Sequence, residues 1–415
     1  MSVATVSTAI APRVWAWWSA RRITLLRIAV VVLSVYALFR LGEGCWRLLS
    51  PNSFTGANDL RFRYDEVHRW FAGEPVYTEL WNAVYPPASY VMLWPLLGWL
   101  SLTAARWLWA ATTVLVVVWF ARVIMRESTA ASTLERVLVA LLFLSMNATG
   151  LTIGNGQLTL HLLPALVVSV LLIRRGQRGW RGDVLIGLIL VMTMVKPTVS
   201  MPFFWLVLFC KGGVRPAVVA GTAYVALTLL AAWFQPIPFV TLLAQWIANS
   251  QGAARFGYAN VSAWCTALGL ERLSLPASFS LLIMLGVWTY RYRHADVWIL
   301  LGVAALVARL WTHHLGYDDV VIVIPLAASF RLARGERYGG DVVAGALIAI
   351  TSVVMLTPES VRHARAPWPL LFSLEHTLVW IPLLLLLLAR APHTAPAAYG
   401  VRLTLPSSPR ARTAD

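Results

Sequence analysis

The sequence predicts an all-α membrane protein that crosses the bilayer several times. Apolar residues make up 59% of the 415-residue chain and charged residues only 13%, whereas soluble globular chains carry about 25% charged residues. The apolar residues form long runs, and arginines occupy the short segments between the runs. These observations favour a bundle of transmembrane helices over a soluble fold.

The first span is predicted at Ile23–Leu41. Residues 1–22 form a basic lead with three tryptophans, which we expect at the cytoplasmic interface. The run follows Arg21-Arg22 and lacks a small-residue cleavage site, so we expect a retained span rather than a signal peptide.

An acid-rich segment, Asn58–Pro87, follows this span. Six of the 18 acidic residues lie between the first span and Tyr85. Apolar side chains recur at helical spacing from Tyr64 to Phe71, which predicts a short amphipathic helix on the membrane surface that Gly73-Glu74-Pro75 stops. The next run, 88–100, has only about 13 residues, fewer than the roughly 20 that a crossing needs, so we expect it to be re-entrant.

About twelve spans are expected in all. The later ones are 104–125, 136–152, 157–173, 184–196, 198–210, 217–234, 276–290, 296–310, 319–331, 341–357 and 369–389. This order puts the arginine-rich segments on the cytoplasmic side, namely Arg122–Arg136, Arg174–Arg181, Lys211–Arg215, Arg291–Arg293 and Arg331–Arg337. The unusual polar motifs, with the long loop Gln235–Pro276, then share the opposite side. We expect a membrane domain over 23–390 and a disordered cytoplasmic tail over 391–415.

The net charge of +16 comes from these interhelical arginines. It therefore reflects topology, and we expect no nucleic-acid partner. The three cysteines lack metal-binding spacing; they are unpaired thiols in helices, or Cys45 pairs with Cys265.

Asp59 and Lys196 are the first two candidate site residues. A carboxylate beside low-dielectric surroundings can act as a general base, although Asn58 or Asp59 could instead cap the following helix. Asp65 and Glu66 are interpreted as the solvated face of that helix. The 34 Lys and Arg residues include only two lysines, and Lys196 stands in an apolar run before Pro197. It suits a phosphate contact, or it snorkels at a helix end.

Two further motifs carry polar side chains. Gly154-Asn155-Gly156-Gln157 offers two amides for a sugar hydroxyl, or is only the turn between two helices. Trp311-Thr312-His313-His314 is followed by Asp318 and Asp319. Adjacent histidines face different sides of a helix and no further ligands follow, so we expect no metal there. One histidine would lie near phosphate or sugar with an aspartate orienting it, or would be an ordinary structural residue.

The order of these motifs resembles a known family. It runs through Asp59, Gly73-x-x-x-Tyr77, Tyr85-Pro86-Pro87, Gly156-Gln157, Lys196-Pro197 and Trp311-x-His313-His314. This pattern, over roughly 23–390, resembles polyprenyl-phosphate-sugar-dependent glycosyltransferases of the GT-C superfamily. More narrowly it resembles the actinobacterial α-1,2-mannosyltransferases of phosphatidylinositol mannosides and lipoglycans and a branching arabinofuranosyltransferase, a group formerly described as a domain of unknown function.

The resemblance implies a GT-C-type bundle and an inverting enzyme of the bacterial plasma membrane. Asp59 would be its catalytic base. The resemblance places Lys196, His313 and His314 near the donor phosphate, and we expect Tyr85, Asn155, Gln157 and Asp318 to help bind donor phosphate or sugar. The donor would be a polyprenyl-phosphate sugar, with mannose as the most favoured sugar. The acceptor would be a glycolipid or polysaccharide on the non-cytoplasmic face. We expect no cofactor and no metal. Leu158-Thr159 replaces the Val-Asn of relatives, and Tyr317-Asp318-Asp319 replaces an apolar stretch, which leaves sugar and acceptor open. The alternative is a transporter or flippase of lipid-linked sugars, for which the midplane polar residues and inverted repeats are missing from the sequence.

Overall fold

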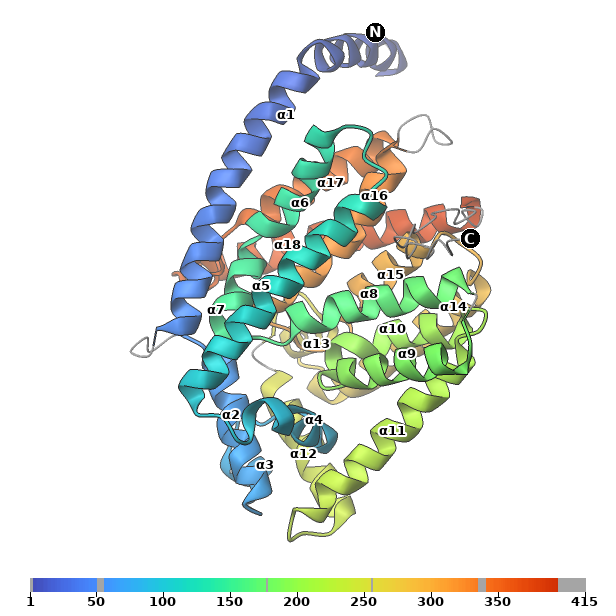
Figure 1. Ribbon diagram of the computed structural model, residues 1–415. Coiled ribbons are helices and arrows are strands. Elements are labelled where there is room, and N and C mark those ends of the chain that lie inside the picture. The colour runs from blue at the N-terminus through green and yellow to red at the C-terminus, as the bar shows by residue number, and fades with distance from the viewer. Residues whose placement is uncertain (1–2, 51–55, 177, 255–256, 335–340, 395–415) are drawn as a thin grey trace, which may run out of the picture.

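The computed structural model describes residues 3–50, 56–176, 178–254, 257–334 and 341–394, with the side chains of residues 3–19, 253–254 and Arg362 left aside. All regular elements in these ranges are helices, as the sequence predicts (Figure 1). The α-helices are α1 (Val3–Leu49), α2 (Asn58–Phe71), α3 (Val76–Glu79), α4 (Pro87–Leu97), α5 (Leu102–Glu127), α6 (Thr133–Ser145), α7 (Asn147–Asn155), α8 (Thr159–Arg175), α9 (Trp180–Thr193), α10 (Pro197–Phe209), α11 (Val214–Trp233), α12 (Phe239–Ala254), α13 (Val261–Ala267), α14 (Ser274–Arg291), α15 (Val297–Leu310), α16 (Val323–Arg334), α17 (Val342–Leu356) and α18 (Trp368–Arg390). The 3-10 helices are η1 (Glu271–Leu273), η2 (Gly316–Ile322), η4 (Glu359–His363) and η5 (Ala391–His393).

Five helical stretches in the described residues are long and apolar enough to cross a membrane. They are Ala20–Leu49, Leu102–Glu127, Val214–Trp233, Glu271–Arg291 and Trp368–His393. Helices α6 and α7 add a sixth if their pair, bent by 50°, is one span. The expected count of about twelve remains a prediction, because other apolar runs form helices of 10–17 residues, shorter than the roughly 20 of a full crossing.

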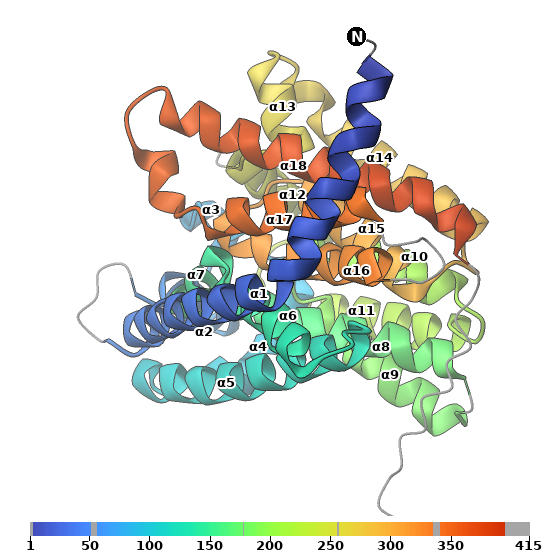
Figure 2. The same cartoon turned by 90° about the horizontal axis from the view of Figure 1, so that it is seen from above.

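One of these short helices forms the centre of the protein. Every residue of α15 is buried, including Trp298, and α10, α16 and α18 pack around it. Seen from above, α8 and α9 lie side by side on one flank and α17 and α18 on the other (Figure 2). The apolar character of α15 therefore reflects burial in protein as well as in lipid, a distinction that composition alone does not make.

The amphipathic helix predicted in the acid-rich segment is α2, but its apolar side does not face the membrane as expected. That side packs on protein: Trp70 stacks on Tyr90 of α4 with ring centroids 4.4 Å apart and donates a hydrogen bond of 3.0 Å to the Ala231 carbonyl of α11. The helix ends just before Gly73, whose φ of 77° suits glycine. Asp65 is exposed as expected, but the prediction for Glu66 is wrong, because Glu66 is fully buried.

Other segments also depart from expectation. The long loop predicted at 235–276 contains α12 and α13. The run 88–100 forms α4, a helix of 11 residues, and its re-entrant course stays a prediction. Of the tail predicted to be disordered, only 391–394 is described, and η5 occupies its start; the rest lies outside the described residues.

The arginine-rich segments come together at one end of the molecule. Glu127 lies 3.3 Å from Arg175, and its carbonyl accepts from Arg331. Further bonds join Arg178 to the Gly212 carbonyl at 2.7 Å and Arg174 to the Ala295 carbonyl at 2.9 Å. At the other end of α5, Tyr64 of α2 donates to the Leu100 carbonyl at 3.0 Å. Helix α5 therefore connects the end that carries α2 with the end that carries the arginines (Figure 1).

Candidate active site

Asp59 lies in the first turn of α2, at the junction of α2 with the end of α7. The Ala57 amide donates to the Gly154 carbonyl at 2.8 Å, and Leu60 rests on Gly156. Gly156 has φ of 68° and ends α7 in the left-handed conformation that glycine favours. The capping alternative for Asn58 and Asp59 is wrong, because the N-cap is Ala57 and both polar residues lie inside the helix. The Asp59 side chain is thereby available to the site.

Lys196 is buried and forms the centre of a polar cluster. Its ammonium group lies 2.6 Å from Asp318 Oδ1, 3.3 Å from Gln157 Oε1 and 3.4 Å from Thr159 Oγ1. The Tyr317 ring lies beneath it, 5.1 Å from Nζ to the centroid. The snorkelling alternative is therefore wrong, since only 7% of Lys196 is exposed. All three ammonium hydrogens have an acceptor in the protein.

Asp318 connects this lysine to a histidine. Its second carboxylate oxygen lies 2.9 Å from His314 Nδ1, and Thr159 donates to its first at 2.7 Å. Asp318 thus has the position expected of the aspartate that orients the histidine. With Nδ1–H donating to Asp318, a neutral His314 presents a lone pair at Nε2, and this buried atom has no partner among the described residues.

Asp59 lies beside the same cluster, because the side chain of Gln157 and the charges of Lys196 and Asp318 all influence the pKa of its carboxyl group. Burial raises the pKa of Asp59 to about 6, although the positive charges of Arg63 and Lys196 oppose this rise. Asp59 lies outside the candidate spans and is partly exposed. A carboxyl group with this pKa is ionised at neutral pH and basic enough to accept a proton.

Sequence reasoning missed Arg63, which follows Asp59 by one helical turn. Its guanidinium carbon lies 4.1 Å from the centroid of the Tyr85 ring, and Nη2 donates to Glu66 at 2.6 Å and to the Asn82 carbonyl at 3.0 Å. The spacing of four residues from Asp59 was the available signal, because it places both on one helix face.

The structure thus brings together most of the predicted site residues: Asp59, Tyr85, Gln157, Lys196, His314 and Asp318. Asn155 is separate, because its side chain accepts from Arg47 at 3.0 Å. His313 lies beside His314 with ring centroids 6.5 Å apart, and burial lowers its pKa to about 4, so it is neutral at pH 7.

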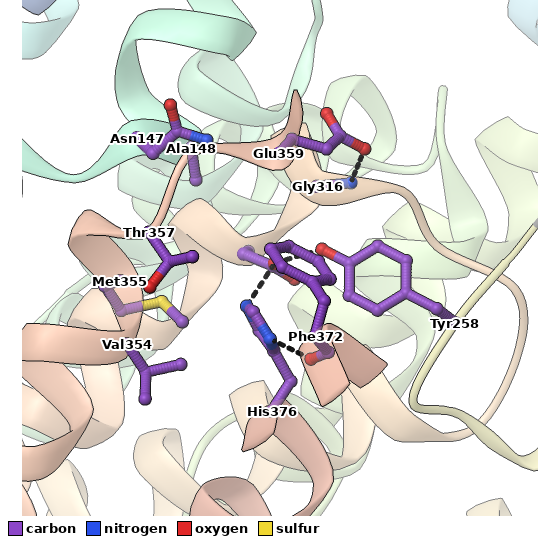
Figure 3. A pocket seen from close by; sticks show the side chains of 11 residues that line it. Asn147, Ala148, Tyr258, Gly316, Val354, Met355, Thr357, Glu359, Phe372 and His376 are labelled. Carbon is purple, nitrogen blue, oxygen red and sulfur yellow. Dashed lines mark hydrogen bonds and ion pairs between the residues drawn. The ribbon is translucent and has the colours of Figure 1, made fainter. Parts of the chain in front are cut away.

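A second polar cluster surrounds Asp319, the residue after Asp318. Arg309 donates to Asp319, as does the Tyr258 hydroxyl at 2.6 Å, and His376 Nε2 lies 3.8 Å away. Figure 3 shows His376 and Tyr258 lining a small pocket into which Glu359 reaches to accept from the Gly316 amide at 3.2 Å. Tyr258 and His376 stand apart from the sequence motifs, so this cluster was not anticipated.

In the described ranges no group of three or more His, Cys, Asp or Glu residues could hold a metal ion. The three cysteines are free there, Cys45 and Cys265 included.

Comparison with known proteins gives one match. Neither the curated proteins nor the solved structures contain a significant relative. The model of Glycosyltransferase family 87 matches residues 83–314, more than half of the chain. This range includes Tyr85, Gln157, Lys196 and both histidines of the Trp-x-His-His motif, and ends before Asp318. The chain therefore belongs to glycosyltransferase family 87, a GT-C family of membrane enzymes that use polyprenyl-phosphate sugar donors.

Proposed function

We propose that the protein is an inverting glycosyltransferase with Asp59 as its general base. It transfers mannose from a polyprenyl-phosphate donor to a glycolipid or polysaccharide at the non-cytoplasmic face of a bacterial plasma membrane, in a bundle of about twelve spans. The observation that carries the proposal is the position of Asp59 beside the Lys196–Asp318–His314 cluster, whose charges act on a carboxyl group of pKa about 6.

In the proposed reaction, Asp59 takes the proton of the acceptor hydroxyl while the oxygen of that hydroxyl attacks the anomeric carbon. The bond between this carbon and the phosphate oxygen breaks, and its electron pair leaves with the polyprenyl phosphate. Attack opposite the phosphate inverts the anomeric configuration. The base and the groups that stabilise the leaving phosphate therefore act on opposite sides of the sugar.

Lys196 supplies positive charge to the leaving phosphate, and one of the two histidines adds to it once that histidine is protonated. The lysine acts mainly through its electrostatic field, because its hydrogens already have acceptors in the protein. Its bonds of 3.3 and 3.4 Å to Gln157 and Thr159 are long, so the phosphate can replace these acceptors. His314 suits this side as well: a proton on Nε2 would create a donor there while Nδ1 remains bonded to Asp318. A single phosphate does not require a bridging metal, so we propose metal-independent transfer.

The test is transfer of radiolabelled sugar from polyprenyl-phosphate-mannose to membrane lipid acceptors, with and without chelator. Asp59→Asn is expected to reduce transfer about 10²- to 10⁴-fold and Asp65→Asn, on the exposed side of the same helix, to preserve it. Folding is checked by size-exclusion chromatography in detergent. A fully active Asp59→Asn protein contradicts the proposal; transfer only from polyprenyl-phosphate-arabinose changes the sugar but not the role of Asp59.

A further inference from the structure

Arg63 is a buried cation with hydrogen-bond donors that the protein leaves open. Its side chain is nearly inaccessible, with the residue 5% exposed. Only Nη2 is bonded, to Glu66 and to the Asn82 carbonyl. The Nε and Nη1 atoms are buried and have no acceptor in the described part of the chain. Buried N–H groups without acceptors are costly, so their persistence at a site indicates a missing partner.

The guanidinium group is also held in place. It stacks on Tyr85 at 4.1 Å, and the Glu66 ion pair of 2.6 Å fixes its Nη2 end. A planar guanidinium that is fixed before the ligand arrives loses little conformational freedom on binding. The open N–H groups suit an anion with several acceptor oxygens, and arginine recognises phosphate and carboxylate groups in this way.

Comparison with Lys196 sharpens this assignment. All three hydrogens of the Lys196 ammonium have acceptors, one of which is Asp318 at 2.6 Å. Arg63 retains three open N–H bonds, one on Nε and two on Nη1. Asp59 lies one turn earlier on the same face, yet the described residues show no ion pair between it and Arg63. The open donors therefore lie next to the proposed base without being occupied by it.

We propose that Arg63 directly binds the phosphate of the polyprenyl-phosphate donor. The inference rests on the proposed function for the identity of the ligand and adds a binding residue to it. The same chemistry would fit a phosphate in the headgroup of a lipid acceptor, so the experiment must separate the two sources.

The experiment measures binding of polyprenyl phosphate and of the matching polyprenyl alcohol to the purified full chain in detergent, by native mass spectrometry. The alcohol lacks the anion, so the ratio of the two affinities isolates the phosphate contact, and no sugar need be known. Wild type is expected to prefer the phosphate, and Arg63→Gln is expected to lose about 10- to 100-fold of that preference. Arg63→Lys should retain part of it, because charge remains without the planar group.

Arg63→Gln leaves Glu66 buried without its partner, so Arg63→Gln/Glu66→Gln, which removes both charges, is measured in parallel. Arg69→Gln is the matched control, because Arg69 is on the same helix and its ion-pair partners in the described ranges are the exposed Glu74 and Glu79. A phosphate preference that survives in the double variant overturns the proposal. So does a transfer assay in which only the acceptor KM rises, which would assign Arg63 to an acceptor headgroup. A third outcome is that the Arg63 variants lose the phosphate preference, while the wild-type protein transfers no sugar from any polyprenyl-phosphate donor. This outcome would count against the proposed reaction and not against the role of Arg63 in binding phosphate.

Discussion

The ionisation of Asp59 is set by neighbours that act in opposite directions. Burial raises its pKa, and the charges of Arg63 and Lys196 lower it, with the balance at about 6. A general base must be deprotonated before it can act. We therefore expect kcat/KM for transfer to fall as pH decreases through about 6 and to vary little between pH 7 and 8.

This pH dependence is measured from initial rates between pH 5 and 8, with activity on return to pH 7.5 as the control for folding. A rate that is level throughout this range would remove Asp59 as the titrating base. A midpoint that moves to higher pH in Arg69→Gln would place the titration elsewhere, because Arg63 and Lys196 are the cations that lower the Asp59 pKa.

The buried pair of Lys196 and Asp318 leads to a prediction about stability. Asp318→Asn leaves the lysine charge buried without its counter-ion, and we expect a loss of about 3–5 kcal/mol in unfolding free energy. Lys196→Met/Asp318→Asn removes both charges and should recover most of this loss. Transfer should stay low in both variants, because the positive charge near the phosphate is absent or misplaced.

Thermal unfolding in detergent, followed by tryptophan fluorescence, compares the two variants with wild type. A double variant no more stable than Asp318→Asn would show that His314 and Thr159, rather than Lys196, account for the stability contribution of Asp318. A double variant with full transfer would exclude a catalytic contribution from the pair.

At the scale of elements, the contact between α7 and α2 positions the base. A Cβ on Gly156 would lie 2.6 Å from Leu60 Cβ, and its φ of 68° is unfavourable for alanine. Gly156→Ala must therefore push the first turn of α2, and Asp59 with it, away from Gln157. We expect a fall in kcat of about 10-fold or more, since small displacements of catalytic groups are costly.

Gly269→Ala provides the matched control. Gly269 has φ of 69° but open space around its Cα, so alanine there brings backbone strain without displacing a neighbour. Both variants should lose about 1–2 kcal/mol of stability from the backbone, and only Gly156→Ala should lose activity beyond that. Equal activity in the two would show that the α7–α2 contact does not control the position of Asp59.

The same contact shows how far sequence reasoning reached. The all-helical fold, the glycine stop after α2 and the proximity of Asp59, Gln157, Lys196, His314 and Asp318 were expected. The burial of Glu66 was not, since helical periodicity does not indicate which surface covers a helix. Arg63 was missed for the same reason: among the described arginines, only the three-dimensional surroundings show which one has two buried nitrogen atoms without an acceptor.

At the scale of the whole molecule, α5 separates two chemically different ends. Its 26 residues span about 39 Å at 1.5 Å per residue, more than the roughly 30 Å of the hydrocarbon core. One end of α5 is tied to α2, which carries Asp59, and the other to the segments with Arg175 and Arg331. We infer that the candidate site and the arginine-rich segments lie at opposite membrane surfaces.

The positive-inside bias then predicts an orientation with the arginines cytoplasmic and the site outside. Single cysteines in a background without Cys45, Cys210 and Cys265 test this in cells. Thr78→Cys, exposed on α3, should react with a membrane-impermeant maleimide in intact cells, whereas Ala131→Cys, exposed between α5 and α6, should react only after permeabilisation. The reverse pattern would put the site in the cytoplasm. Labelling of both from outside would mean that α5 does not cross, because its two ends could not then lie at opposite surfaces.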